Sequence, residues 1–78
     1  MVNMPFLFLL FVIQSAIQEA ESHNDRARVE FKEGRFENAS QQYTRALDCL
    51  PKDQAKEERA KYFTNRAACY VKMVCNLI

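Results

Sequence analysis

The sequence predicts an all-α protein in which two antiparallel helices form a hairpin and a third helix packs against the second. No proline stands between positions 5 and 51, and the single glycine leaves too few turn signals for an all-β protein. Apolar residues near the centre of the chain recur four, three and four residues apart, which places them on one face of a helix: Ala39, Tyr43, Ala46 and Leu50.

The amino-terminal segment, residues 1–19, differs in composition from everything after it. The first charged side chain is Glu19, and an unbroken apolar run extends from Phe6 to Ile13. This run is far shorter than the roughly 20 residues that cross a bilayer, although it matches the hydrophobic region of a secretory signal. No Lys or Arg precedes it, and cleavage after Ser15 would leave Ile13 at the upstream recognition position. A signal peptide, a short buried segment and a membrane anchor all stay open as interpretations.

From Ala20 onward we expect three helices, at about 20–33, 37–50 and 54–74. Gly34 provides the turn between the first two, and Pro51 ends the second because proline cannot continue a helix. Asp53 is expected to cap the third helix, with acidic residues in its early turns. The third helix should bury a stripe formed by Ala60, Phe63, Ala67 and Tyr70–Val71. Five aromatic residues are predicted to lie in the core: Phe31, Phe36, Tyr43, Phe63 and Tyr70.

Charge and motif content exclude several classes of function. Eleven basic and ten acidic residues give a net charge of +1, whereas a nucleic-acid-binding protein would show a basic excess. No Ser-His-Asp set, phosphate-binding loop or paired carboxylates support an enzyme. Three cysteines, no Cys-x-x-Cys and a single histidine fit neither a disulfide framework nor a zinc site, so we expect no cofactor.

The stretch "FKEGRFENASQQYTRALDCLP" resembles helices A and B of a tetratricopeptide repeat (TPR). The following segment "YFTNRAACYVK" resembles the first helix of a second repeat, offset by 40 residues rather than 34 because "PKDQAKEE" forms a longer turn. The resemblance covers about residues 20–73 and implies a partial α-solenoid of about one and a half repeats, followed by a divergent tail at 74–78. The first repeat agrees with the family at Ala27, Phe31, Gly34, Phe36, Ala39, Tyr43, Ala46 and Pro51.

Within the second repeat, "NRAACYVK" is similar to a segment of TPR domains that bind the acidic C-termini of Hsp90 and Hsp70. The resemblance implies that Asn65 faces a groove and donates its amide to the terminal carboxylate of a peptide. The family's first helix carries a clamp lysine and Gly-Asn, where this chain has Asn24, Ala27 and Arg28, so Arg28 stands in as the cation. The candidate peptide-binding residues are therefore Asn65, Arg28, Arg66 and Asn24.

The leading hypothesis is a cytoplasmic protein-interaction module of co-chaperone type. The alternatives are a small secreted or membrane-associated helical protein and a truncated TPR product without independent function. Stacked repeats need about three units to bury a continuous core, so one and a half should leave a face of the third helix exposed. We therefore expect marginal stability or self-association.

Overall fold

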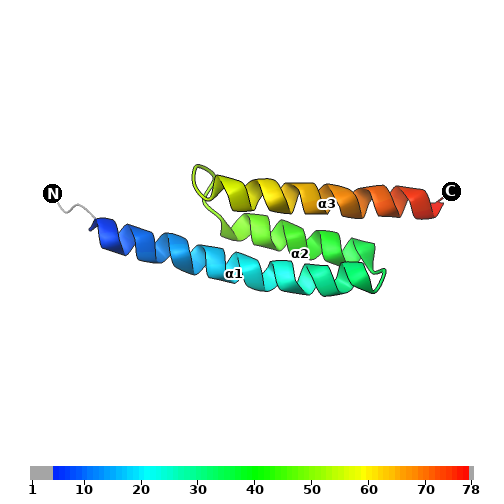
Figure 1. The fold of residues 1–78 in the computed structure, drawn as a ribbon, viewed down its shortest axis with the longest axis horizontal. Coiled ribbons are helices and arrows are strands. Elements are labelled where there is room, and N and C mark those ends of the chain that lie inside the picture. Colours follow the sequence, from blue (N-terminus) through cyan, green and yellow to red (C-terminus); the bar gives the residue numbers. More distant parts are fainter. Residues whose placement is uncertain (1–4, 78) are drawn as a thin grey trace.

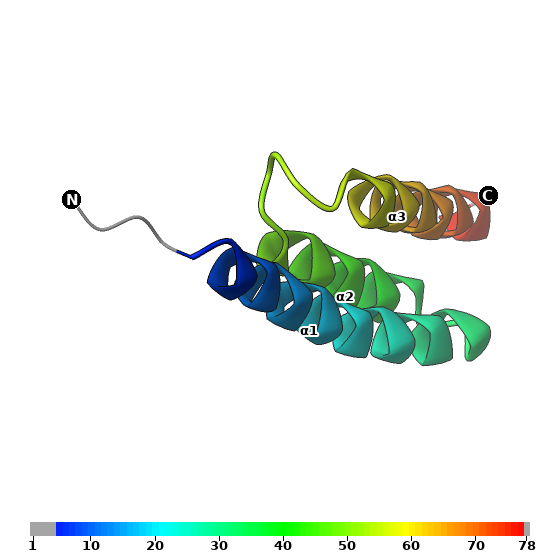
Figure 2. The same cartoon turned by 60° about the vertical axis from the view of Figure 1, so that its left-hand side comes forward.

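The structure is a computed structural model that describes residues 5–77. Within this range the secondary structure consists of α-helices joined by turns, with no strand, as the sequence predicts. The helices are α1 (Phe6–Lys32), α2 (Phe36–Cys49) and α3 (Lys56–Leu77). Figure 1 shows α2 lying between the other two and antiparallel to both. Figure 2 shows from a second direction that α1 and α3 lie on different sides of α2 and scarcely touch.

The turn between α1 and α2 is a glycine-terminated helix end. Gly34 adopts a left-handed backbone with φ of +83°. Its N–H donates to the carbonyl of Phe31 at 3.0 Å, and the N–H of Arg35 donates to the carbonyl of Glu30 at 2.8 Å. These two bonds form a Schellman motif, which satisfies carbonyls that the helix end would otherwise leave free. The motif ends α1 and reverses the chain within three residues.

We predict that Gly34→Ala destabilises the fold through the backbone alone. A Cβ at this position would meet no atom within 4 Å, so no steric clash contributes. The left-handed conformation costs an L-residue about 1–2 kcal/mol, which corresponds to a decrease of ~5 °C or more in the melting temperature. Asparagine tolerates this conformation better, so Gly34→Asn is the matched control and should cost less. Equal melting temperatures of G34A and the wild type in thermal circular dichroism would contradict this reading.

The core between α1 and α2 is built on small residues. The alanines at 20, 27, 39 and 46 are all fully buried, two from each helix. Because alanine projects only a methyl group, the two backbones approach closely, and Tyr43 fills the remaining space with 3% of its surface exposed. From the other side of α2, α3 contributes Tyr62 and Cys69, both with no exposed surface.

The first helix begins at Phe6 rather than near residue 20. Pro5 precedes it, and its carbonyl accepts from the N–H of Leu9 at 3.1 Å. Nothing between Pro5 and Gly34 breaks a helix, so the apolar run continues the helix that starts the hairpin. The interpretation of this run as a buried segment is wrong for Phe6–Val12, whose side chains are exposed. Residues 1–4 of the predicted leader lie outside the described range.

Figure 1 shows the amino-terminal part of α1 extending past the ends of α2 and α3, while the end of α3 extends the opposite way. These projections account for the elongated dimensions of 59 × 19 × 16 Å. In residues 5–77 no helix combines the length and the apolar character needed to cross a membrane.

The third helix packs through a face different from the predicted one. Phe63, Tyr70 and Val71 are 43%, 46% and 60% exposed, so the predicted stripe does not form the core. The buried residues are Tyr62 and Cys69 instead. The stripe and the buried pair lie on adjacent faces of α3, and the face with Tyr62 and Cys69 is the one that packs on α2. Phe31 and Phe36 are half-buried and make an edge-to-face pair with ring centroids 5.1 Å apart.

The start and end of α3 also differ from the expectation. The helix begins at Lys56, and Asp53 lies in the preceding turn instead of capping it. Ala55 occupies the junction with φ of 55°, and its carbonyl accepts from the N–H of Arg59 at 2.9 Å. At the other end, the helix continues to Leu77, past the expected end near residue 74; Ile78 lies outside the described range.

We predict that the fold loses stability above about pH 9. Burial raises the pKa of the Cys69 thiol above 9.0 and, as the main cause in each, the pKa of the Tyr43 and Tyr62 hydroxyls above 10.0. A raised folded-state pKa means that stability is fully present below the unfolded value and is lost as the pH rises through the folded one. The melting temperature should hold from pH 7 to about 8.5 and then fall.

Tyr62→Phe provides the control for this pH dependence. The buried Tyr62 hydroxyl has no hydrogen-bond partner among the described residues, so its removal should leave neutral-pH stability at least unchanged. The variant should also show a shallower alkaline decline, because one ionising group is gone. If the melting temperature increases as the pH is raised beyond 9, or if it declines more steeply in Y62F than in the wild type, ionisation of these buried groups does not cause the loss of stability.

Candidate functional site

A cavity of about 330 Å³ lies where all three helices contribute side chains. Arg28 and Phe31 come from α1, Tyr43 comes from α2, and Asn65 and Ala68 come from α3. Two of the four predicted peptide-binding residues, Arg28 and Asn65, therefore line one cavity although they stand far apart in the sequence.

The packing of each helix explains how these two residues reach the cavity. Arg28 follows Ala27, which is fully buried against α2, so the arginine sits at the edge of the α1–α2 contact and stays exposed. Asn65 stands one turn after Tyr62 and one turn before Cys69, the two buried residues of α3. The amide is thus half-buried on the inner face of α3. A position inside a helix is unfavourable for asparagine, and a role toward the cavity gives a reason for it.

The electrostatics of the cavity favour an anion. Its lining residues carry one positive charge, from Arg28, and no carboxylate. Burial is the main cause that raises the pKa of the Tyr43 hydroxyl, and the positive charge of Arg28 lowers it, so Arg28 lies close enough to act on the phenol. Phe31 and Ala68 supply apolar wall. The arrangement suits a small acceptor group, such as a carboxylate, bound by a guanidinium and an amide.

Arg66 lies on a different side of α3. Its Nη1 donates to the Thr44 Oγ1 at 3.0 Å, which ties α3 to α2. Its guanidinium lies 5.2 Å from the ring centroid of Phe63 and 5.8 Å from that of Tyr70. Arg66 borders a second hollow of about 220 Å³, so the structure separates it from Arg28 and Asn65.

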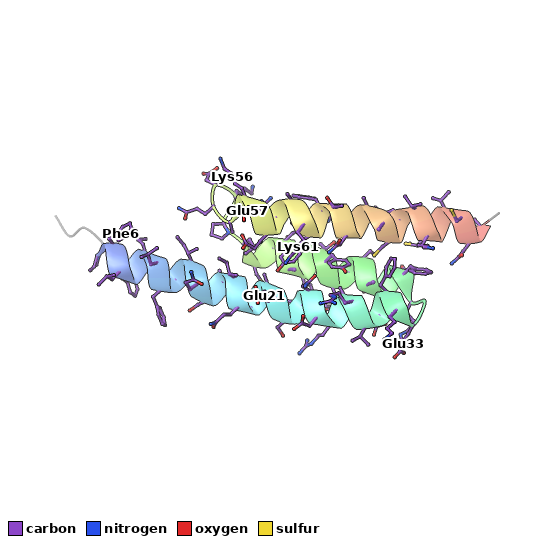
Figure 3. The ribbon with its side chains drawn as sticks, viewed as in Figure 1. Phe6, Glu21, Glu33, Lys56, Glu57 and Lys61 are labelled. Atoms are coloured by element: carbon purple, nitrogen blue, oxygen red, sulfur yellow. The ribbon has the colours of Figure 1, made fainter. Side chains whose placement is uncertain are left out.

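Sequence analysis missed the cationic character of this second hollow. Arg59 lies 5.4 Å from the ring centroid of Phe63, on which Arg66 also stacks, and its Nη1 donates to the carbonyl of Leu47 at 3.4 Å. Lys52 adds a third cation, and Asp48 contributes the single carboxylate among the lining residues. The spacing of Arg59, Phe63 and Arg66 on one helix face was the available signal. Figure 3 shows further charged side chains, Lys56, Glu57 and Lys61, along the first turns of α3.

Asn24 is the fourth predicted residue, and it does not line the cavity. It lies one turn before Arg28 on α1 and is 7% exposed. Its Oδ1 has no hydrogen-bond partner among the described residues. The structure therefore places Asn24 between packed helices.

A further open hollow of about 400 Å³, at the α1–α2 corner, is lined by Gly34–Asn38 together with Met73 and Asn76, which sequence analysis did not single out.

Comparison with known proteins gave no match to a family model, a curated protein or a solved structure.

Proposed function

We propose that this chain is a TPR-like protein-interaction module that binds the acidic C-terminal end of a partner protein, of the kind carried by Hsp90 and Hsp70. The observation that carries the proposal is the shared cavity of Arg28 and Asn65. Asn65 was selected from the sequence for its resemblance to a carboxylate-binding TPR segment, and Arg28 was selected as the cation that stands in for the family's clamp lysine. The two residues reach the cavity from different helices.

The chemistry of the two side chains suits a chain terminus. A guanidinium offers up to five N–H donors, and an asparagine amide offers two, whereas a terminal carboxylate only accepts. Charge-assisted hydrogen bonds of this kind are about twice as strong as neutral ones. The exposed position of Arg28 lets a peptide enter from solvent, and Phe31 and Ala68 offer apolar surface beside the contact.

The exposed face of α3 supports a partial solenoid. Phe63, Tyr70 and Val71 form the face of α3 that the second helix of the second repeat would cover if the resemblance holds. All three side chains are exposed. A second copy of the chain or a further helix could cover this face, which is the basis for the proposed self-association. The remaining cations of the family's clamp belong to a third repeat, so binding by Arg28 and Asn65 alone should be weak.

We predict that a fluorescent peptide with the acidic C-terminal sequence of Hsp90 binds the full chain, and that Arg28→Ala and Asn65→Ala each weaken binding by about ten- to a hundredfold. The estimate follows from about 1.5–3 kcal/mol for a hydrogen bond to a charged group. Fluorescence polarisation measures the affinity. Arg26→Ala is the matched control, because Arg26 is exposed on the same helix and does not line the cavity.

The same peptide with an amidated C-terminus separates capture of the terminus from general charge attraction. Amidation removes the carboxylate and should weaken binding as much as Asn65→Ala does. Equal affinity of the amidated peptide, or equal loss in R26A and R28A, would contradict the proposed role of the cavity.

A second candidate function rests on the amino-terminal half of α1. Its apolar side chains face solvent, with Phe6, Leu7 and Phe11 at 72%, 77% and 67% exposure, and Figure 3 marks Phe6 at the free end of the helix. Such a segment suits a secreted or membrane-associated helical protein in which the run acts as a signal or as a surface anchor.

The intact mass of the protein isolated from its native cell distinguishes the two candidates. A cytoplasmic interaction module keeps the apolar segment, so we expect a mass that includes residues 1–20. Loss of the first 15 to 20 residues would instead favour the secretory pathway and would exclude a cytosolic chaperone as the partner.

A further inference from the structure

Three side chains with different metal-ligating atoms meet beside the α1–α2 contact. They are Glu19 and His23 of α1 and Cys49 of α2, and one ligand atom from each lies within 4.8 Å of the others. Glu19 and His23 are four residues apart on one helix and therefore share a face. Cys49 is the last residue of α2, and the antiparallel packing brings it alongside that face.

Buried neighbours hold the cluster in place. Ala20, next to Glu19, has no exposed surface, and Leu50, next to Cys49, is 5% exposed. The two ligand-bearing segments thus flank core residues, whereas the ligands themselves are exposed or half-buried and open to solvent. An ion could reach the cluster without unfolding the hairpin.

A hydrogen bond from His23 to a fourth side chain orients the histidine ring. The Nδ1 of His23 and the Oε1 of Gln42 are 3.0 Å apart. An amide oxygen only accepts, so this bond keeps the proton on Nδ1 and leaves the lone pair on Nε2. Metal-binding histidines in proteins commonly use one ring nitrogen for the metal and the other for such an outer partner.

The charges at the cluster favour a cation. Glu19 lies within the cluster and Asp48 stands next to Cys49, so two carboxylates bring negative charge to this place. A divalent ion bound by one thiolate, one carboxylate and a neutral imidazole would give a complex with no net charge. Mg²⁺ and Ca²⁺ prefer oxygen ligands, whereas Zn²⁺ accepts sulfur, nitrogen and oxygen together.

We propose that Glu19, His23 and Cys49 form a zinc site that links α1 to the end of α2. Zinc bonds of about 2.0–2.3 Å in a tetrahedron place ligand atoms about 3.3–3.8 Å apart. The ligand atoms of the cluster lie within 4.8 Å of one another, so side-chain movements of about 1 Å would bring them to zinc-binding distance. Three protein ligands leave the fourth position to water. The site is independent of the proposed peptide cavity, which contains none of these residues.

Titration of the reduced full chain with Zn²⁺ alone, in competition with a chromogenic chelator, tests the proposal. We expect one equivalent per chain and at least tenfold weaker binding for Cys49→Ser, His23→Gln and Glu19→Gln. Cys75→Ser and Glu21→Gln are the matched controls, since Cys75 and Glu21 are exposed residues outside the cluster, and both should bind like the wild type. Figure 3 marks Glu21 on α1.

One spectroscopic and one thermal measurement test whether Cys49 is a ligand. Substitution with Co²⁺ should produce a thiolate charge-transfer band that is lost in C49S and kept in C75S. Excess Zn²⁺ should raise the melting temperature of the wild type and not that of C49S, because an ion that binds only the folded chain stabilises it. Glu19 is exposed, so E19Q keeps the hairpin folded and makes its loss of binding interpretable.

Three results would overturn the site. Binding of half an equivalent would mean that two chains share the ion. A charge-transfer band that survives in C49S and disappears in C75S would assign the thiolate elsewhere. Equal zinc affinity in the wild type and in E19Q, H23Q and C49S would reduce the binding to unspecific surface association.

Discussion

The close packing of α1 on α2 through buried alanines determines where the candidate side chains of these two helices lie. A methyl group at each crossing point lets two backbones approach, and an antiparallel hairpin then pairs the middle of α1 with the end of α2. This single contact places Arg28 beside Tyr43 and His23 beside Gln42. A larger residue at Ala27 or Ala46 would separate the helices and disperse both groups at once.

The second helix was the most predictable element because the residue types at its two ends, Gly34 and Pro51, determine where it begins and ends. Glycine provides the left-handed residue after α1, and proline stops the continuation of α2, so the observed bounds lie within about one residue of those expected. Pro5 stands directly before the first helix, but the expected start lay near residue 20 because the apolar run after Pro5 was assigned to a separate segment. Its apolar run was interpreted through composition alone, and composition does not reveal that a neighbouring packed segment can extend into it.

The third helix shows why periodicity cannot select the buried face. Its sequence has two apolar faces, one with Phe63 and Tyr70 and one with Tyr62 and Cys69, and the partner that is present decides which is covered.

The candidate site was likewise predictable only in part. Arg28 and Asn65 were selected from the sequence and share a cavity, whereas Arg66 and Asn24 lie elsewhere. His23 and Cys49 were set aside because no sequence motif joins residues brought together only by tertiary packing.

The continuity of α1 has a consequence for how its outer half forms. Starting an isolated helix is costly, since several residues must be fixed before the first hydrogen bond forms, whereas adding a residue to an existing helix costs little. The half of α1 that packs on α2 is such a template. The exposed half therefore becomes helical by propagation from within the domain, and it can unwind residue by residue from Phe6 while the hairpin stays folded. The amino-terminal segment thus acts as an extension whose helicity depends on the hairpin, whereas the hairpin does not depend on the extension.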